Sequence, residues 1–170
     1  QAMAEEKGGS AQDYFSGMVF FSNTLKLPAA EAEQFVYCAE RGFEVSVPSM
    51  TSAGGSAPVT LAGAVAVHLA EAMTANILRR AFYGGRKLEL SSTIAPYDMK
   101  TLIYAYGRPE RQLCNLMMAD VAKRYHAPCS GHGGHSDAKR PGPEAAAQRM
   151  LTSIPTLMGC GGIRVCAGLL

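Results

Sequence analysis

The sequence has little net charge, no run of lysine or arginine and no long apolar stretch. Its formal net charge is +2 over 170 residues, so it lacks the basic surface that nucleic acids or anionic membranes attract. No uninterrupted apolar run reaches the roughly 18 residues of a transmembrane helix, and the first residues lack the basic and then apolar pattern of a signal peptide. These absences predict a protein that binds neither nucleic acid nor membrane.

Paired cysteines are also missing. The chain has an odd number of cysteines, none with CxxC spacing, at Cys38, Cys114, Cys129, Cys160 and Cys166. Such scattered residues do not form a disulfide framework. We therefore expect reduced thiols in a cytoplasmic protein.

By length the chain is one domain. Residues 1–17 begin with a polar, partly acidic stretch and are expected to be a flexible lead-in or a cloning remnant. Helices are predicted from prolines suited to a first helical turn, at Pro28, Pro58, Pro109 and Pro143, and Ser56 is the expected N-cap of the second helix.

Short apolar segments, partly β-branched, separate these helices, as in strands buried within a parallel sheet. They cover residues 17–23, 43–49, 87–93, 128–133 and 162–168. The alternation predicts an α/β fold with right-handed crossovers, either a small doubly wound domain or part of a barrel.

Two observations favour the barrel. No glycine-rich phosphate loop follows the first strand, where a nucleotide-binding domain carries one. The segment RVCAGLL stops where the loop after a strand is expected to begin. The predicted fold is therefore a partial (β/α)8 TIM barrel of about five parallel strands and four helices.

A set of short motifs runs through residues 19–170. In order they are APVTLAGA after a PSM…GG loop, PYDM, YGRPE, YHAPC and SDAK. Their order and spacing resemble the trimethylamine methyltransferase family. The resemblance implies that residues 18–170 are a fragment of a TIM-barrel methyltransferase domain from a longer protein.

The resemblance also implies a reaction. An enzyme of this kind transfers a methyl group from a methylated amine to the Co(I) corrinoid (cobalamin) of a partner protein, in methylamine metabolism and methanogenesis. Some members carry pyrrolysine, whereas this sequence has only standard residues, which favours a quaternary amine such as glycine betaine over trimethylamine. No residue is assigned to binding the corrinoid, and no bound metal is expected.

Catalytic residues of a barrel gather on the loops after its strands. Here these loops are residues 47–57, 91–99, 131–139 and 166–170. The predicted catalytic residues are His132, His135 and Asp137, because imidazoles can bind a substrate carboxylate or act as acid/base groups.

A cationic methyl donor needs an aromatic wall and a nearby anion, because a quaternary ammonium offers no hydrogen bonds. Glu89, Ser92 and Tyr97 are the predicted substrate-binding residues. Glu89 could equally be a paired structural carboxylate. Asp98 is expected to cap a helical turn after APYDM rather than to bind substrate, and mid-helix His68 is expected to be an ordinary helix-face residue.

Three alternatives remain open for the histidine loop and for the chain. Cys129, His132 and His135 have C-x-x-H-x-x-H spacing, which also fits a zinc-dependent barrel enzyme. The loop could instead be a flexible surface segment, with Lys139 and Arg140 a solvated pair. The chain could also be a non-catalytic binding or scaffold fragment, whose exposed sheet edges would favour a homo-oligomer.

Overall fold

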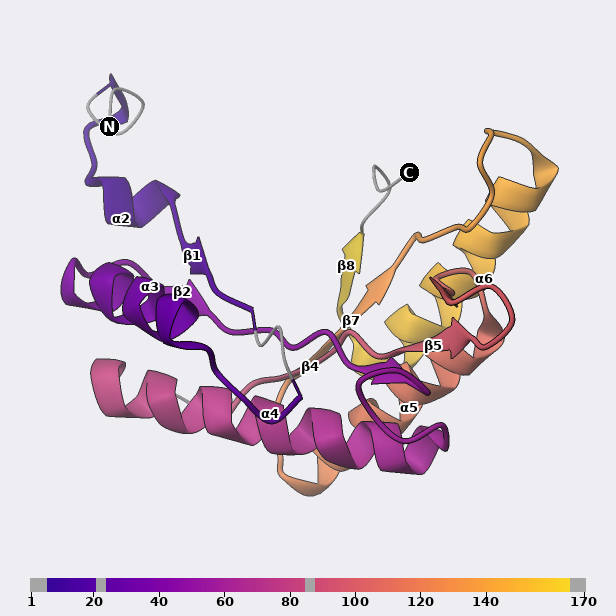
Figure 1. Ribbon diagram of the computed structural model, residues 1–170. Helices are drawn as coiled ribbons and strands as arrows, with labels where there is room; N and C mark the ends of the chain where they lie inside the picture. The colour runs from indigo at the N-terminus through magenta and orange to yellow at the C-terminus, as the bar shows by residue number, and fades with distance from the viewer. Residues whose placement is uncertain (1–5, 21–23, 85–87, 166–170) are drawn as a thin grey trace.

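A computed structural model describes residues 6–20, 24–84 and 88–165 of the chain. Its helices and strands follow one another as α2 (Ala11–Tyr14), β1 (Gly17–Met18), α3 (Ala29–Glu40), β2 (Val45–Ser46), β3 (Ser52–Ala53), α4 (Leu61–Tyr83), β4 (Leu90–Ser92), β5 (Ala95–Asp98), β6 (Ile103–Tyr104), α5 (Pro109–Arg124), β7 (Cys129–Gly133), α6 (Pro143–Cys160) and β8 (Ile163–Val165) (Figure 1).

The strands pair mainly in parallel. β1 pairs with β2, β3 with β5, and β4 with β7, which pairs in turn with β8. One pair, β5 with β6, is antiparallel. These pairings confirm the predicted α/β class, and the four predicted long helices correspond to α3, α4, α5 and α6.

The second of these helices begins later than the sequence predicts. α4 starts at Leu61, and its N-cap is Thr60, whose hydroxyl accepts a hydrogen bond from the backbone N–H of Gly63. The predicted cap, Ser56, instead accepts a hydrogen bond from the backbone N–H of Ser52. Its hydroxyl therefore stabilises the loop before α4.

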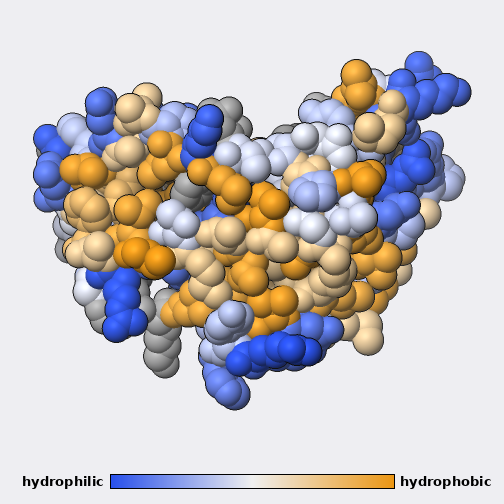
Figure 2. All heavy atoms as spheres, turned by 60° about the horizontal axis from the view of Figure 1, so that its bottom comes forward, coloured by the Kyte–Doolittle hydropathy of each residue, from blue (hydrophilic) through white to orange (hydrophobic). Residues whose placement is uncertain are grey.

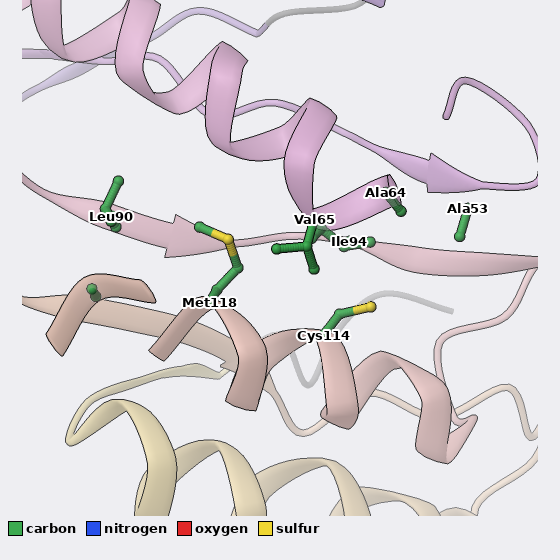
Figure 3. Packing of buried hydrophobic residues seen from close by; sticks show 8 residues of the cluster. Ala53, Ala64, Val65, Leu90, Ile94, Cys114 and Met118 are labelled. Atoms are coloured by element: carbon green, nitrogen blue, oxygen red, sulfur yellow. The ribbon is translucent and has the colours of Figure 1, made fainter. Parts of the chain in front are cut away.

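Helices α4, α5 and α6 contact the strands β4, β7 and β8 and lie on one side of them (Figure 1). Buried side chains of α4, β4 and α5 meet in one core cluster, which includes Val65, Leu90, Ile94, Cys114 and Met118 (Figure 3). Burying each large apolar side chain contributes about 1.5–3 kcal/mol. A second cluster, containing Val19, Phe35, Val45, Val47 and Ala75, lies under α3.

Glycines set the distance between β7 and α6. A Cβ on Gly131 would lie 2.4 Å from Cγ2 of Thr156, and one on Gly133 would lie 2.8 Å from the carbonyl oxygen of Thr152. Both contacts are shorter than real Cβ atoms adopt. The alternate positions of the strand therefore face α6, and His132 faces the opposite side.

Helix α4 is long and apolar enough to cross a membrane by length and composition alone. Three of its polar side chains are nevertheless buried against the rest of the fold: His68, Glu71 and Arg79. The Arg79 guanidinium forms ion pairs with Glu44 and Glu89, both at 3.0 Å. These contacts are those of a helix packed within the α/β fold.

His68 is more than a helix-face residue, because its imidazole is fully buried. Its Nδ1 lies 2.7 Å from Oγ of Ser49 and 2.9 Å from Oγ1 of Thr51, and its Nε2 lies 2.8 Å from the carbonyl oxygen of Ser91. Burial lowers the pKa of His68. The neutral ring therefore links the loop after β2 to α4 and β4.

Hydrophobic surface is extensive on the face that Figure 2 displays, where apolar residues form a broad band bordered by hydrophilic ones. Exposed large apolar side chains on α6 recur at helical spacing, at Met150, Leu151, Ile154, Leu157 and Met158. Surfaces of this kind commonly contact other protein surfaces. Self-association of the chain stays a prediction.

Candidate active site

Five aromatic rings are successive neighbours, from Tyr97 through Tyr104, Tyr106 and His135 to His132. Successive ring centroids lie 5.9, 4.9, 5.0 and 6.2 Å apart. The rings of Tyr106, His135 and His132 are nearly parallel, with interplanar angles of 8° and 11°. We call these five residues the aromatic row. It connects the β3-β5-β6 sheet to the β4-β7-β8 sheet.

The hairpin of β5 and β6 supplies the first two rings. Tyr97 and Tyr104 are directly opposite each other in its antiparallel register, a position in which aromatic side chains stabilise a strand pair. The turn between them is closed by Asp98, whose carboxylate accepts hydrogen bonds from the backbone N–H groups of Lys100 and Thr101. Asp98 therefore caps a turn, but it is the turn of a β-hairpin and not the expected helical turn.

The loop after β2 reaches the same hairpin. The Tyr104 hydroxyl lies 2.7 Å from the carbonyl oxygen of Thr93 and 3.2 Å from that of Thr51, and can donate to either. A Cβ on Gly55 would lie 3.0 Å from the ring of Tyr97. Burial raises the pKa of Tyr104 above its usual value, so the phenol stays protonated. The loops after three strands thus meet at the row, and the predicted fourth loop, residues 166–170, lies outside the described residues.

The Asp137 carboxylate holds the backbone at Tyr106, the middle ring of the row. Its two carboxylate oxygens accept hydrogen bonds from the backbone N–H groups of Tyr106, at 2.9 Å, and Gly107, at 2.8 Å. Its own N–H donates to Oε1 of Gln148 in α6 at 2.7 Å. Asp137 therefore contacts the backbone that carries Tyr106, and the Tyr106 ring in turn contacts His135, the neighbour of His132.

The two histidines of the row are neutral at physiological pH. Burial is the main cause that lowers the pKa of both His132 and His135 to about 4, and the nearby positive charge of Arg111 is the second. His135 is only 3% exposed, and its Nδ1 has no hydrogen-bond partner among the described residues. The other four rings are half-buried. His135 is thus the most buried ring of the row.

One buried cation lies beside the row. The Arg111 side chain, in the first turn of α5, is 1% exposed, and its guanidinium carbon is 5.2 Å from the centroid of the Tyr106 ring. The ring face stabilises this charge. The row consequently combines neutral aromatic walls with one fixed positive charge.

Two predicted substrate-binding residues do not join the row. The Glu89 carboxylate accepts a hydrogen bond from Arg79 at 3.0 Å, and its backbone exchanges hydrogen bonds with the Asn76 side chain of α4. These are the contacts of a paired structural carboxylate. Ser92 is fully buried, on the side of β4 that carries Leu90.

The spacing that suggested zinc does not assemble a ligand set. Cys129 and His132 are three positions apart on β7, so their side chains lie on opposite faces of the strand. The Cys129 thiol instead contacts that of Cys160. Across residues 6–20, 24–84 and 88–165, no three histidine, cysteine or acidic side chains are grouped to hold a metal ion. Lys139 and Arg140 are exposed, as a solvated pair would be.

Sequence reasoning missed Tyr104, Tyr106 and Arg111. The first two are separated by one residue in IYAYG, a spacing that places side chains on the same face of an extended chain. This alternating spacing was the feature of the sequence from which the two tyrosines could have been predicted to lie together. Nothing in the local sequence distinguishes Arg111 from the other charged residues at the start of α5.

Comparison with known proteins adds a family assignment. The model of the family described as trimethylamine methyltransferase (MTTB) matches residues 7–170. The chain is 30% identical over 160 residues to trimethylamine methyltransferase MttB of Methanosarcina barkeri (strain Fusaro / DSM 804), covering 94% of this chain and 32% of that protein.

Two bacterial proteins are similar to the same region. Trimethylamine methyltransferase MttB of Desulfitobacterium hafniense (strain DSM 10664 / DCB-2) is 28% identical, with coverage of 92% of this chain and 32% of that protein. The glycine betaine methyltransferase of Desulfitobacterium hafniense (strain Y51) is 30% identical, with coverage of 78% and 28%. The chain thus spans about a third of the length of the curated relatives it matches.

Proposed function

The chain belongs to the trimethylamine methyltransferase family, and from this membership and the aromatic row we propose that it forms part of a methyltransferase. The methyl donor is a tertiary or quaternary methylated amine, and the acceptor is the Co(I) corrinoid of a partner protein. We also propose a cytoplasmic location, which the free thiols of the cysteines within the described residues support.

The aromatic row is the observation that carries this proposal. An N-methylated cation is held by the faces of aromatic rings, which attract positive charge without requiring a hydrogen bond. His132 and His135 contribute neutral rings, since the pKa of each is lowered to about 4. A protonated imidazole in their place would repel the donor.

We propose that the parallel strands are consecutive strands of a (β/α)8 barrel. Four long helices alternate with β1, β2, β4, β7 and β8 along the chain, and β4, β7 and β8 are neighbours in sequence order within their sheet. His135 and Asp137 follow β7 directly, as catalytic loops follow the strands of a barrel. The position of the row supports this arrangement.

The row fits a reaction in which the chain binds the donor and supplies no nucleophile. All five members are neutral rings, and Asp137 uses both carboxylate oxygens to hold backbone N–H groups. A bound Co(I) corrinoid would supply the nucleophile that accepts the methyl group. The described residues would orient the donor, and the neutral imidazoles of His132 and His135 would add no positive charge beside its methyl groups.

Among methylated amines, we favour a donor that carries its own carboxylate. Arg111 carries a buried positive charge beside Tyr106, and its electrostatic field disfavours a ligand with only positive charge and favours a zwitterion. Glycine betaine has this structure, and one relative is named a glycine betaine methyltransferase. Trimethylamine is the second candidate.

The test mixes purified protein with free cob(I)alamin and with trimethylamine, tetramethylammonium or glycine betaine, and follows cobalamin absorbance. Glycine betaine should give the fastest methylation. Tyr106→Leu should weaken donor binding about tenfold, whereas Tyr125→Leu, an exposed tyrosine at the end of α5, should not.

The other outcomes separate the alternative functions. Donor binding in calorimetry without methylation, also in the presence of the corrinoid protein, would indicate a non-catalytic binding fragment. Near-stoichiometric zinc in the purified protein would favour the zinc-dependent alternative. Equal binding by the wild type and Tyr106→Leu would contradict the role of the aromatic row.

A further inference from the structure

The thiols of two cysteines lie close together on the side of β7 that is opposite the His132 side chain. The Sγ atoms of Cys129 and Cys160 are 3.7 Å apart, although the residues are 31 positions apart in sequence. Cys129 is the first residue of β7, and Cys160 is the last residue of α6. Both are half-buried, and neither is in a disulfide.

The two thiols differ in acidity because they interact. The Cys129 thiol donates a hydrogen bond to the sulfur of Cys160. This bond is the main cause that raises the pKa of Cys129 and lowers the pKa of Cys160, and the positive charge of Lys123 also lowers the latter. Since the thiolate is the nucleophile in thiol chemistry, Cys160 is the residue that reacts first.

The surroundings permit the small movement that a disulfide requires. A disulfide bond is about 2.05 Å long, so the sulfurs must approach by about 1.6 Å. Gly161, which follows Cys160, has a φ of 70° and ends α6, and Gly162 comes next. Glycines at this helix end can absorb a change in the backbone direction of Cys160.

We propose that Cys129 and Cys160 are a redox-active pair that forms a reversible disulfide by exchange with a low-molecular-weight disulfide such as oxidised glutathione. The Cys160 thiolate attacks one sulfur of the reagent, which releases one reduced thiolate and leaves a mixed disulfide. Cys129 loses its proton to solvent and attacks Sγ of Cys160, which releases the second thiolate. Two protein thiols are oxidised, and one disulfide is reduced to two thiols.

This pair is independent of the proposed methyl transfer, but it lies close to the aromatic row. The Cys160 thiol also donates to the carbonyl oxygen of Asn115 at 3.7 Å. The Asn115 side chain in turn donates to the carbonyl oxygen of His132 at 3.3 Å. A disulfide would therefore fix the end of α6 to the strand that positions His132.

The test incubates the folded, reduced chain with oxidised glutathione, quenches free thiols by alkylation and maps the peptides by mass spectrometry. We expect the loss of two titratable thiols and a linked peptide pair containing Cys129 and Cys160, both restored by dithiothreitol. Cys160→Ser and Cys129→Ser should each abolish the linked pair, whereas Cys38→Ser, a matched control, should retain it.

The wild-type map decides the proposal even if a variant fails to fold. No linked pair, a pair that joins other cysteines, or only a stable mixed disulfide with glutathione would overturn it. Because the readout is covalent mass, it does not depend on methyl transfer.

Discussion

Replacing Asp137 with alanine should destabilise the fold as well as the donor site. The substitution removes the acceptor of two hydrogen bonds, from the N–H groups of Tyr106 at 2.9 Å and Gly107 at 2.8 Å. Hydrogen bonds to a charged group contribute about 1.5–3 kcal/mol each, and water can replace part of that at a half-buried site. We expect a loss of about 2–4 kcal/mol in the free energy of unfolding.

Urea unfolding followed by circular dichroism measures this loss. Asp120→Ala is the matched control, because Asp120 is exposed and, within the described part of the chain, pairs with Lys123 of the same helix, an interaction worth about 0.5 kcal/mol or less. If Asp137→Ala were as stable as the control while methyl transfer was lost, Asp137 would act on the substrate rather than through Tyr106. That result would refute the positioning role derived from its contacts.

Three further predictions concern charge, packing and the limits of the site. The pKa of His135 is about 4 in the folded chain and about 6.5 when unfolded, so the unfolded chain binds the proton first and stability should fall as pH drops from about 6.5 to about 4. Chemical denaturation at several pH values should show a weaker pH dependence for His135→Gln than for the wild type. Met118→Ala should lower the free energy of unfolding by about 2–5 kcal/mol. Leu113 is 50% exposed on the same helix, so Leu113→Ala should change the free energy of unfolding by about 0.5 kcal/mol. Equal losses for the two variants would contradict the assignment of Met118 to the core. Glu89→Gln should leave the donor affinity measured by calorimetry unchanged, and a tenfold loss of affinity would indicate that Glu89 does bind the donor.

The sequence was most informative where a residue acts locally. Prolines and glycines marked the four long helices, and the histidines of the loop after β7 led to the prediction of a site there, which stays a prediction. The error at the start of α4 is local as well, since Thr60 and Ser56 are both good N-caps and only the packing of Leu61 against the core selects between them.

Residues whose role depends on distant partners were harder to predict. Glu89 shares an ion pair with Arg79, ten positions earlier on α4. Tyr106 reaches His135 only because the carboxylate of Asp137, 31 positions later, holds its backbone. The spacing of Cys129 and His132 suggested common ligands until strand alternation placed them on opposite faces. Contacts of this range follow from the packing of strands and helices, which no local pattern encodes.

Side chains along β7 point alternately to its two faces, and the space available for a side chain differs between these faces. Gly131 and Gly133 leave no space for a side chain toward α6, so substitution there would displace a helix. Ser130 and His132 face the other way, where Ser130 lines a cavity together with Ser91 and Arg164. The chemistry of this strand is therefore open to redesign at positions 130 and 132 while its scaffold stays fixed. A library that varies only those two positions should leave the packing of α6 unchanged.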